Sequence, residues 1–218
     1  MKPTRNATLL SLTMIGLALT VCGLSTSAEP TYGGLDVLPE PDVLLTDRLR
    51  DIDVYGGSRL RLTDWEDILE VRVYVTEVSL IFVVRTSGEL PMASNLLRSG
   101  LLLVFVDMDG APGYLPFSPY LFDLDAVDRA GYEFGIGQNG PVGLRRVSTM
   151  GGATSPYTSI EHWRDGSTDY FEVGWDRLGG RPDHAISFFV FTARVSRNGL
   201  VVYMDRAPNN RPESIPLP

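Results

Sequence analysis

The stretch Leu69-Glu70-Val71-Arg72-Val73-Tyr74-Val75-Thr76 places an apolar side chain at every second position. Successive side chains of an extended strand point to opposite faces, so this alternation is typical of a strand that is buried on one side. Residues 79–85 follow with a less regular alternation, and residues 101–106 are apolar throughout. These two runs indicate strands that are covered on both faces.

Six further segments have strand-like patterns, namely residues 132–137, 143–148, 158–163, 169–174, 186–195 and 200–204. Turn signals separate them, and Asn198-Gly199 is a strong signal for a tight hairpin. Long helical periodicity is absent from the sequence. We therefore expect an all-β protein: an antiparallel two-sheet β-sandwich of the jelly-roll or immunoglobulin-like kind, with about nine to ten strands.

The N-terminal segment, residues 1–28, has the layout of a secretory signal peptide. A basic head is followed by an apolar stretch over residues 9–24, and small residues precede Glu29. The apolar stretch is short for a membrane span, and no second one follows. The sequence predicts a protein that is secreted or at the cell surface (periplasmic in a Gram-negative cell), with no integral membrane segment after cleavage.

The rest of the chain divides into a lead-in over residues 29–42, a sandwich domain over residues 43–206 and a proline-rich tail over residues 207–218. Cleavage would remove Lys2, Arg5 and Cys22, so that of 19 basic and 27 acidic residues it leaves 17 and 27, a net charge of −10. The expected mature chain thus has no lysine and no cysteine, which excludes Schiff bases and disulfides. Nucleic acid and anionic lipid are not expected as partners, because each needs a basic face.

The segment Asp107-Met108-Asp109-Gly110 follows the apolar run directly and allows two interpretations. Aspartates at a strand end can accept hydrogen bonds from their own turn amides. Two crowded carboxylates can also bind a hard cation, and Asp123 and Asp125 in the next loop could add ligands for Ca²⁺. An EF-hand is excluded, because Ala111 and Ser118 occupy its fifth and twelfth positions.

Aromatic residues at strand ends and turns are candidates for a sugar-binding surface, because flat rings stack on the C–H faces of pyranoses. The candidates are Trp65, Trp163, Trp175 and Tyr114. The alternative is that tryptophans of a sandwich are buried at the edge of its core, and we favour this alternative for Trp175. Catalysis is not expected, because the chain has only two histidines and no Gly-x-Ser-x-Gly motif.

Five short motifs follow one another in an order that resembles a group of secreted domains. They are DILEVRV (67–73) leading into LIFVV (80–84), FVDMDG (105–110) with Gly113-Tyr114, AGYEFGI (130–136), YFEVG (170–174) with Leu178-Gly179, and DRAP (205–208). The group is the DOMON-like β-sandwiches, which include family 9 carbohydrate-binding modules and the C-terminal module of glucodextranase-like proteins. The resemblance implies a β-sandwich that binds carbohydrate. Some relatives hold haem b through His, Met or Lys, but haem is not expected here.

These observations predict a secreted, non-catalytic binding module for a polysaccharide or surface glycan. The segment 107–110 is interpreted first as a strand end and second as a calcium site that stabilises the module. The alternative function is a structural or assembly subunit of a cell-surface layer or filament, in which strands are exchanged between subunits. The lead-in and the tail are the candidates for such exchange, because either could pair with an open sheet edge.

Overall fold

A computed structural model of the chain describes residues 38–54, 63–89, 100–110, 133–138, 142–146, 158–195, 201–208 and 212–217. The chain separates into two compact units, Met1–Leu38 and Pro39–Pro218, and every element described here belongs to the second unit. None of the described residues belongs to a helix long and apolar enough to span a membrane.

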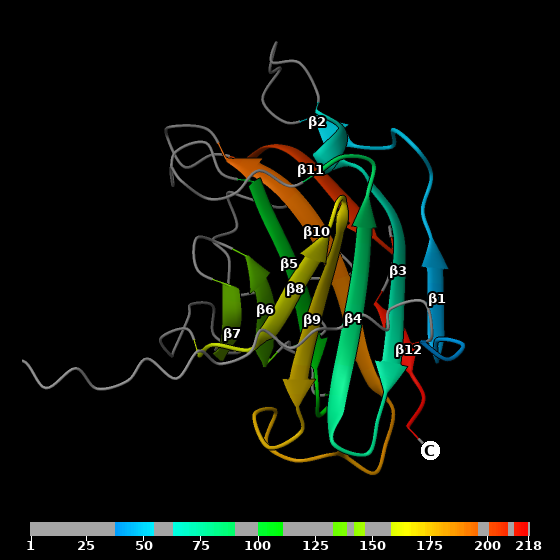
Figure 1. Ribbon diagram of the computed structural model, residues 1–218, viewed down its shortest axis with the longest axis vertical. Helices are drawn as coiled ribbons and strands as arrows, with labels where there is room; N and C mark the ends of the chain where they lie inside the picture. The colour runs from blue at the N-terminus through cyan, green and yellow to red at the C-terminus, as the bar shows by residue number, and fades with distance from the viewer. Residues whose placement is uncertain are drawn as a thin grey trace, which may run out of the picture. The chain divides into compact units, whose positions relative to one another are not determined.

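Two antiparallel sheets pack face to face as a β-sandwich (Figure 1). The five-stranded sheet, in front in Figure 1, has the order β1 (Val43–Thr46), β3 (Ile68–Val75), β4 (Ser79–Thr86), β9 (Thr168–Gly174) and β8 (Glu161–Asp165). The seven-stranded sheet behind it has the order β2 (Asp53–Val54), β11 (Val201–Ala207), β10 (Ile186–Val195), β5 (Gly100–Asp107), β6 (Phe134–Gln138) and β7 (Val142–Arg146); β12 (Glu213–Ile215) also pairs with β10. One 3-10 turn, η2 (Asp64–Glu66), leads into β3.

The predicted fold class is confirmed, and each of the nine predicted strands has a counterpart in the structure. The additional strands β1, β2 and β12 are short. The segment expected to be a C-terminal tail contributes β12, in which Ile215 is fully buried opposite Ile186. β11 pairs with the second half of β10, so β12 can pair with the first half.

The alternation that predicted β3 is interrupted at its start by a β-bulge. Ile68 pairs with Thr86 and Glu70 pairs with Arg85, so Leu69 is the extra residue. As a result Ile68 is fully buried whereas Leu69 is only partly buried, although the sequence pattern had placed Leu69 on the core face. A bulge shifts the alternation by one position, which period-two patterns cannot reveal.

The seven-stranded sheet is apolar on both of its faces. Phe188 of β10 faces the other sheet, where its ring lies 5.4 Å from that of Phe82. Phe189 and Phe191 point to the opposite face and lie 5.2 and 5.5 Å from the ring of Phe105 in β5. All three of these outer rings are at most 2% exposed. The uninterrupted apolar run of β5 therefore reflects burial on two sides, as expected, and its neighbour β10 is buried on both faces as well.

Candidate functional site

The end of β5 forms the turn that the sequence predicts. Asp107 is 5% exposed, its Oδ1 accepts a hydrogen bond of 2.8 Å from the N–H of Gly110, and its Oδ2 accepts one of 3.1 Å from the Oγ of Ser187. Gly110 has a φ of 64°, which glycine adopts without strain. The carboxylate of Asp107 is thus held by the turn and by β10.

Asp107, Asp109 and Glu133 form the strand-end cluster, in which one carboxylate oxygen from each residue lies within 4.8 Å of the others. Glu133 directly precedes β6, and the pairing of Val106 with Phe134 brings it beside Asp107. The sequence pattern alone does not identify Glu133 as a ligand, because only the register of β5 and β6 makes it a neighbour of Asp107. The predicted ligands Asp123 and Asp125 lie outside the described residues.

The charges of the strand-end cluster are unfavourable without a counter-ion. Burial, with smaller contributions from the charges of Asp109 and Asp107, raises the pKa of Glu133 to about 7, even though a hydrogen bond from the N–H of Met108 lowers it. Burial also raises the pKa of Asp107. One oxygen of Glu133, Oε1, is buried and accepts no hydrogen bond from the described residues. A cation would reduce the repulsion among the three carboxylates and would be a partner for the Oε1 of Glu133.

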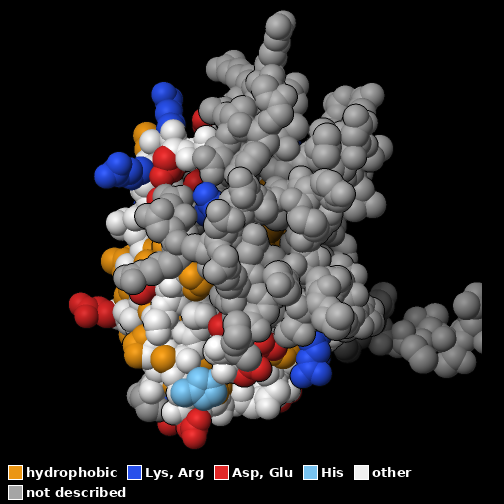
Figure 2. Space-filling view, turned by 180° about the vertical axis from the view of Figure 1, so that it is seen from behind, with side chains coloured by type: hydrophobic (Ala, Val, Ile, Leu, Met, Phe, Trp, Pro, Cys, Tyr) orange, Lys and Arg blue, Asp and Glu red, His pale blue; other side chains and the backbone are white. Residues whose placement is uncertain are grey.

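A histidine lies next to the strand-end cluster. The Nε2 of His184 is 2.8 Å from the carbonyl oxygen of Met108, and a hydrogen bond with Asp183 is the main cause that raises the pKa of His184. Seen from behind, a histidine lies among acidic side chains at the lower end of the molecule (Figure 2). The exposed side chain of Asp109 leaves this end open to solvent.

Two of the predicted sugar-stacking tryptophans are part of the core. Trp65 in η2 is 9% exposed, and Trp175 is 4% exposed with its Nε1 donating a 3.0 Å hydrogen bond to the carbonyl oxygen of Thr76. Burial against the sheets leaves neither ring a face for a sugar. The core interpretation favoured for Trp175 therefore holds, and for Trp65 it replaces the sugar-stacking candidate. Tyr114 lies outside the described residues.

Trp163 differs from the other two tryptophans because it is on the outer face of the five-stranded sheet. It is only partly buried, in the edge strand β8, and stacks on Tyr170 of β9 with ring centroids 5.0 Å apart and an interplanar angle of 9°. The register continues this row across the sheet through Val83, Arg72 and Leu44. The row combines aromatic, aliphatic and charged side chains on one face.

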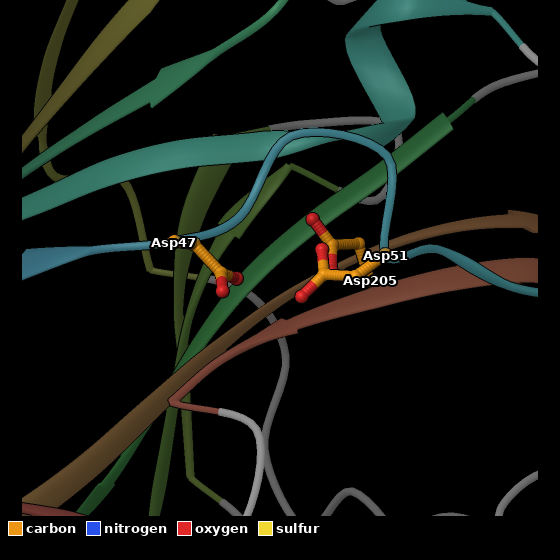
Figure 3. A group of neighbouring side chains, drawn as sticks. All are labelled: Asp47, Asp51 and Asp205. Atoms are coloured by element: carbon orange, nitrogen blue, oxygen red, sulfur yellow. The ribbon is translucent and has the colours of Figure 1, made fainter.

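A second group of carboxylates, the inner cluster, consists of Asp47, Asp51 and Asp205 (Figure 3). Asp47 and Asp51 belong to the connection between β1 and β2, and Asp205 belongs to β11. Asp205 is 2% exposed, and burial raises its pKa to about 8, with Asp47 and Asp51 adding to the shift. Its two oxygens accept hydrogen bonds from the N–H groups of Ile68 (2.5 Å) and Arg206 (2.8 Å).

No local sequence pattern predicts the inner cluster, because its members come from segments about 150 residues apart. Comparison of the sequence with models of protein families and with curated proteins found no match.

Proposed function

We propose that the chain is a secreted, non-catalytic binding module whose strand-end cluster holds a divalent cation and whose ligand is carbohydrate. The main support for a cation site is that one carboxylate oxygen each of Asp107, Asp109 and Glu133 lies within 4.8 Å of the others. The resemblance to family 9 carbohydrate-binding modules supports the carbohydrate part.

Calcium fits the strand-end cluster better than other common cations. All three side chains offer oxygen, which hard cations prefer, whereas zinc prefers the nitrogen and sulfur of His and Cys. Ca²⁺ accepts irregular geometry and completes its shell with water, and the exposed Asp109 leaves room for water. Mg²⁺ gives up its water reluctantly and needs a tighter octahedral site, so we expect it to bind more weakly.

Thermal unfolding in EDTA and in millimolar Ca²⁺ tests the cation part. At a hundredfold excess over the dissociation constant, a ligand of the folded state alone adds about 2.7 kcal/mol, which corresponds to roughly 5–10 °C for a domain of this size. We expect this shift for the wild type and for Glu77→Gln, an exposed control in the turn between β3 and β4. Asp107→Asn should abolish it, and its calcium-free form should be no less stable than the wild type. Equal midpoints with and without Ca²⁺ in the wild type would reject the site.

The carbohydrate part is supported by the row of side chains that begins with Trp163 and Tyr170 on the outer face of the five-stranded sheet. Aromatic rings beside charged groups are the usual means of holding a sugar, since the rings contact C–H groups and the charges bind hydroxyls. Retention on insoluble polysaccharides, and binding to a glycan array, test this part. Trp163→Ala should reduce retention, whereas the core substitution Trp175→Phe should not. No retention of the wild type on any glycan would reject carbohydrate as the ligand.

A structural or assembly subunit is the second candidate, and the open edge of β1 favours it. β1 pairs with β3 on one side only in the described sheet, and Leu44 in this strand is 54% exposed. Exposed strand edges are sites at which another chain can add a strand. The molecular mass in solution separates the two functions. A concentration-dependent oligomer that is lost on deletion of residues 29–37 would favour assembly, and a monomer at all concentrations would exclude it.

A further inference from the structure

A hollow of about 520 Å³ lies where the connection between β1 and β2 meets η2 and the end of β4. Its walls combine aliphatic, hydroxyl, acidic and basic side chains: Leu49, Arg50, Ile52, Thr63, Asp64, Asp67 and Ser87. Trp65, one of the predicted sugar-binding residues, is buried, whereas its neighbour Asp64 lines the hollow.

The walls of the hollow are fixed by hydrogen bonds between distant parts of the chain. Asp67 is 2% exposed, and its Oδ1 accepts a 2.8 Å hydrogen bond from the N–H of Arg50. Arg50 has a φ of 67°, a strained value for a residue other than glycine, and the bond to Asp67 contributes to holding it there. On the other side, the N–H of Ser87 donates a 2.8 Å hydrogen bond to the carbonyl oxygen of Asp67. Asp67 thus connects the segment around Arg50 with the segment around Ser87, which lie on two sides of the hollow.

The close fit of η2 against the end of β4 depends on a glycine. A Cβ atom on Gly88 would lie 2.8 Å from the Cβ of Asp64, which is too close for an ordinary contact. The absence of a side chain at this position therefore lets Asp64 stand beside Ser87 at the hollow. The hollow is formed by the fold itself and does not require a rearrangement to open.

The chemistry of the walls matches a hydroxylated ring better than a simple ion. The guanidinium of Arg50 donates hydrogen bonds, the carboxylates of Asp64 and Asp67 accept them, and the hydroxyls of Thr63 and Ser87 can do both. Leu49 and Ile52 supply an apolar surface for C–H groups. The volume lies within the range of about 300–1,000 Å³ that is usual for small-molecule sites, and it is far larger than a metal ion needs.

Cations fit this hollow less well for two reasons. Arg50 offsets one of the two carboxylate charges in the wall, so the hollow attracts an organic cation only weakly. A metal ion needs several oxygens at one point, and within the described part of the chain the carboxylates that converge nearby are Asp47, Asp51 and Asp205, none of which lines the hollow.

We propose that the hollow is a binding site for a neutral saccharide unit, separate from the row around Trp163. Asp67 and Asp64 accept hydrogen bonds from its hydroxyls, Arg50 donates to them, and the aliphatic side chains contact one face of the ring. This inference rests on the proposed carbohydrate function and adds to it a defined pocket for a single sugar or for the end of a glycan chain.

The test is a titration of the ¹⁵N-labelled protein with glucose, galactose, mannose, N-acetylglucosamine, cellobiose and maltose. We expect the amide signals of Arg50, Asp67 and Ser87 to move with at least one of these sugars. Asp67→Asn keeps an acceptor for the N–H of Arg50 but loses a charge, so it should weaken binding about tenfold, as expected for one hydrogen bond to a charged group. Glu77→Gln, the charge-matched control at the other end of β3, should bind like the wild type.

Arg50→Gly gives a second variant in case Asp67→Asn does not fold. Glycine adopts a φ of 67° freely and retains the N–H that bonds to Asp67, so the fold is preserved while the guanidinium is lost. We expect the melting temperature to be retained or raised and the affinity for the sugar to fall by about tenfold.

The outcomes separate this inference from the proposed function. If the wild type is retained by polysaccharides but sugars move no signal of the hollow, or the hollow variants bind normally, the inference is wrong and the carbohydrate function stands. If Ca²⁺ alone moves the signals of Arg50, Asp67 and Ser87, the hollow is a cation site and the inference is also wrong. If no free sugar or polysaccharide binds at all, the proposed carbohydrate function fails together with it.

Discussion

The two carboxylate clusters lie beside the same strand, β10, through its two neighbours β5 and β11, but differ in what holds them. Asp107 pairs with Ser187 and Asp205 pairs with Thr192, so the two clusters are separated by five residues of β10, or about 17 Å at ~3.3 Å per residue. The strand-end cluster includes the exposed Asp109 and the Oε1 of Glu133, which accepts no hydrogen bond from the part of the chain that the structure describes. In the inner cluster, both oxygens of the buried Asp205 already accept backbone hydrogen bonds.

The difference in exposure and hydrogen bonding indicates different roles for the two carboxylate clusters. The strand-end cluster is open and keeps an acceptor available, which suits an exchangeable cation with its water. The inner cluster instead uses Asp205 to satisfy the N–H groups of Ile68 and Arg206, and so connects β11 to the start of β3. Three acidic residues at short distance are therefore not a sufficient sign of a metal site. The exposure of Asp109 in one cluster and the backbone hydrogen bonds of Asp205 in the other distinguish the two.

The largest expected effect is on the pH dependence of stability through Asp205. Its folded-state pKa of about 8 lies above the ordinary value of 3.8, so the folded state binds a proton more tightly than the unfolded state. The free energy of unfolding should therefore fall as the pH rises from about 4 to about 8, by several kcal/mol at ~1.4 kcal/mol per pKa unit.

Asp205→Asn tests this dependence in urea unfolding measured across the same pH range. The variant should lose most of the slope and be more stable than the wild type at pH 8, even though the amide retains only one acceptor for the two N–H groups. Asp165→Asn, at an exposed position of β8, is the control and should keep the wild-type slope. An unchanged slope in Asp205→Asn would show that the inner cluster is not under electrostatic strain.

A smaller effect is expected from Asp47→Asn. The charge of Asp47 raises the pKa of Asp205, although less than burial does. Its removal should lower that pKa and reduce the slope without abolishing it, with a gain of about 1 kcal/mol at pH 8. The same unfolding series measures it, and a slope as flat as that of Asp205→Asn would mean that repulsion rather than burial dominates.

The smallest effect is expected at the strand-end cluster from Ser187→Ala. The hydroxyl of Ser187 donates to the Oδ2 of Asp107 and lowers its pKa, so its loss should destabilise the charged form. We expect a loss of about 0.5 kcal/mol in the free energy of unfolding at neutral pH, measured by chemical denaturation in the absence of calcium. If stability increased instead, Asp107 would not depend on β10 for its position.

The sequence predicts the nine longer strands because alternation and apolar runs are local properties. It does not predict β1, β2 or β12, since strands of two to four residues exist only through their partners. The aspartates at positions 107 and 109 are visible as candidates because they lie two residues apart at a strand end. Glu133 joins them only through the register between β5 and β6, and the inner cluster depends on the packing of β11 beside β3.

The tryptophans also show how little a single sequence says about burial. Trp65 and Trp163 lie in similar local sequences, each next to charged residues and close to a strand end. Burial separates them, because Trp65 packs between the sheets while Trp163 lies on the outer face of an edge strand. A single sequence does not show whether the side chain of a turn residue points into the core or into solvent, so it leaves both tryptophans as candidates.

Isothermal titration with Ca²⁺ at neutral pH, on the wild type, Glu133→Gln and Asp205→Asn, tests most directly the claim that the strand-end cluster rather than the inner cluster binds a cation. Glu133→Gln removes a carboxylate from the strand-end cluster, one oxygen of which accepts no hydrogen bond from the described residues, whereas Asp205→Asn leaves that cluster intact. We predict one calcium site per chain in the wild type and in Asp205→Asn, and none in Glu133→Gln. Calcium binding that survives Glu133→Gln, or that disappears in Asp205→Asn, would contradict this assignment.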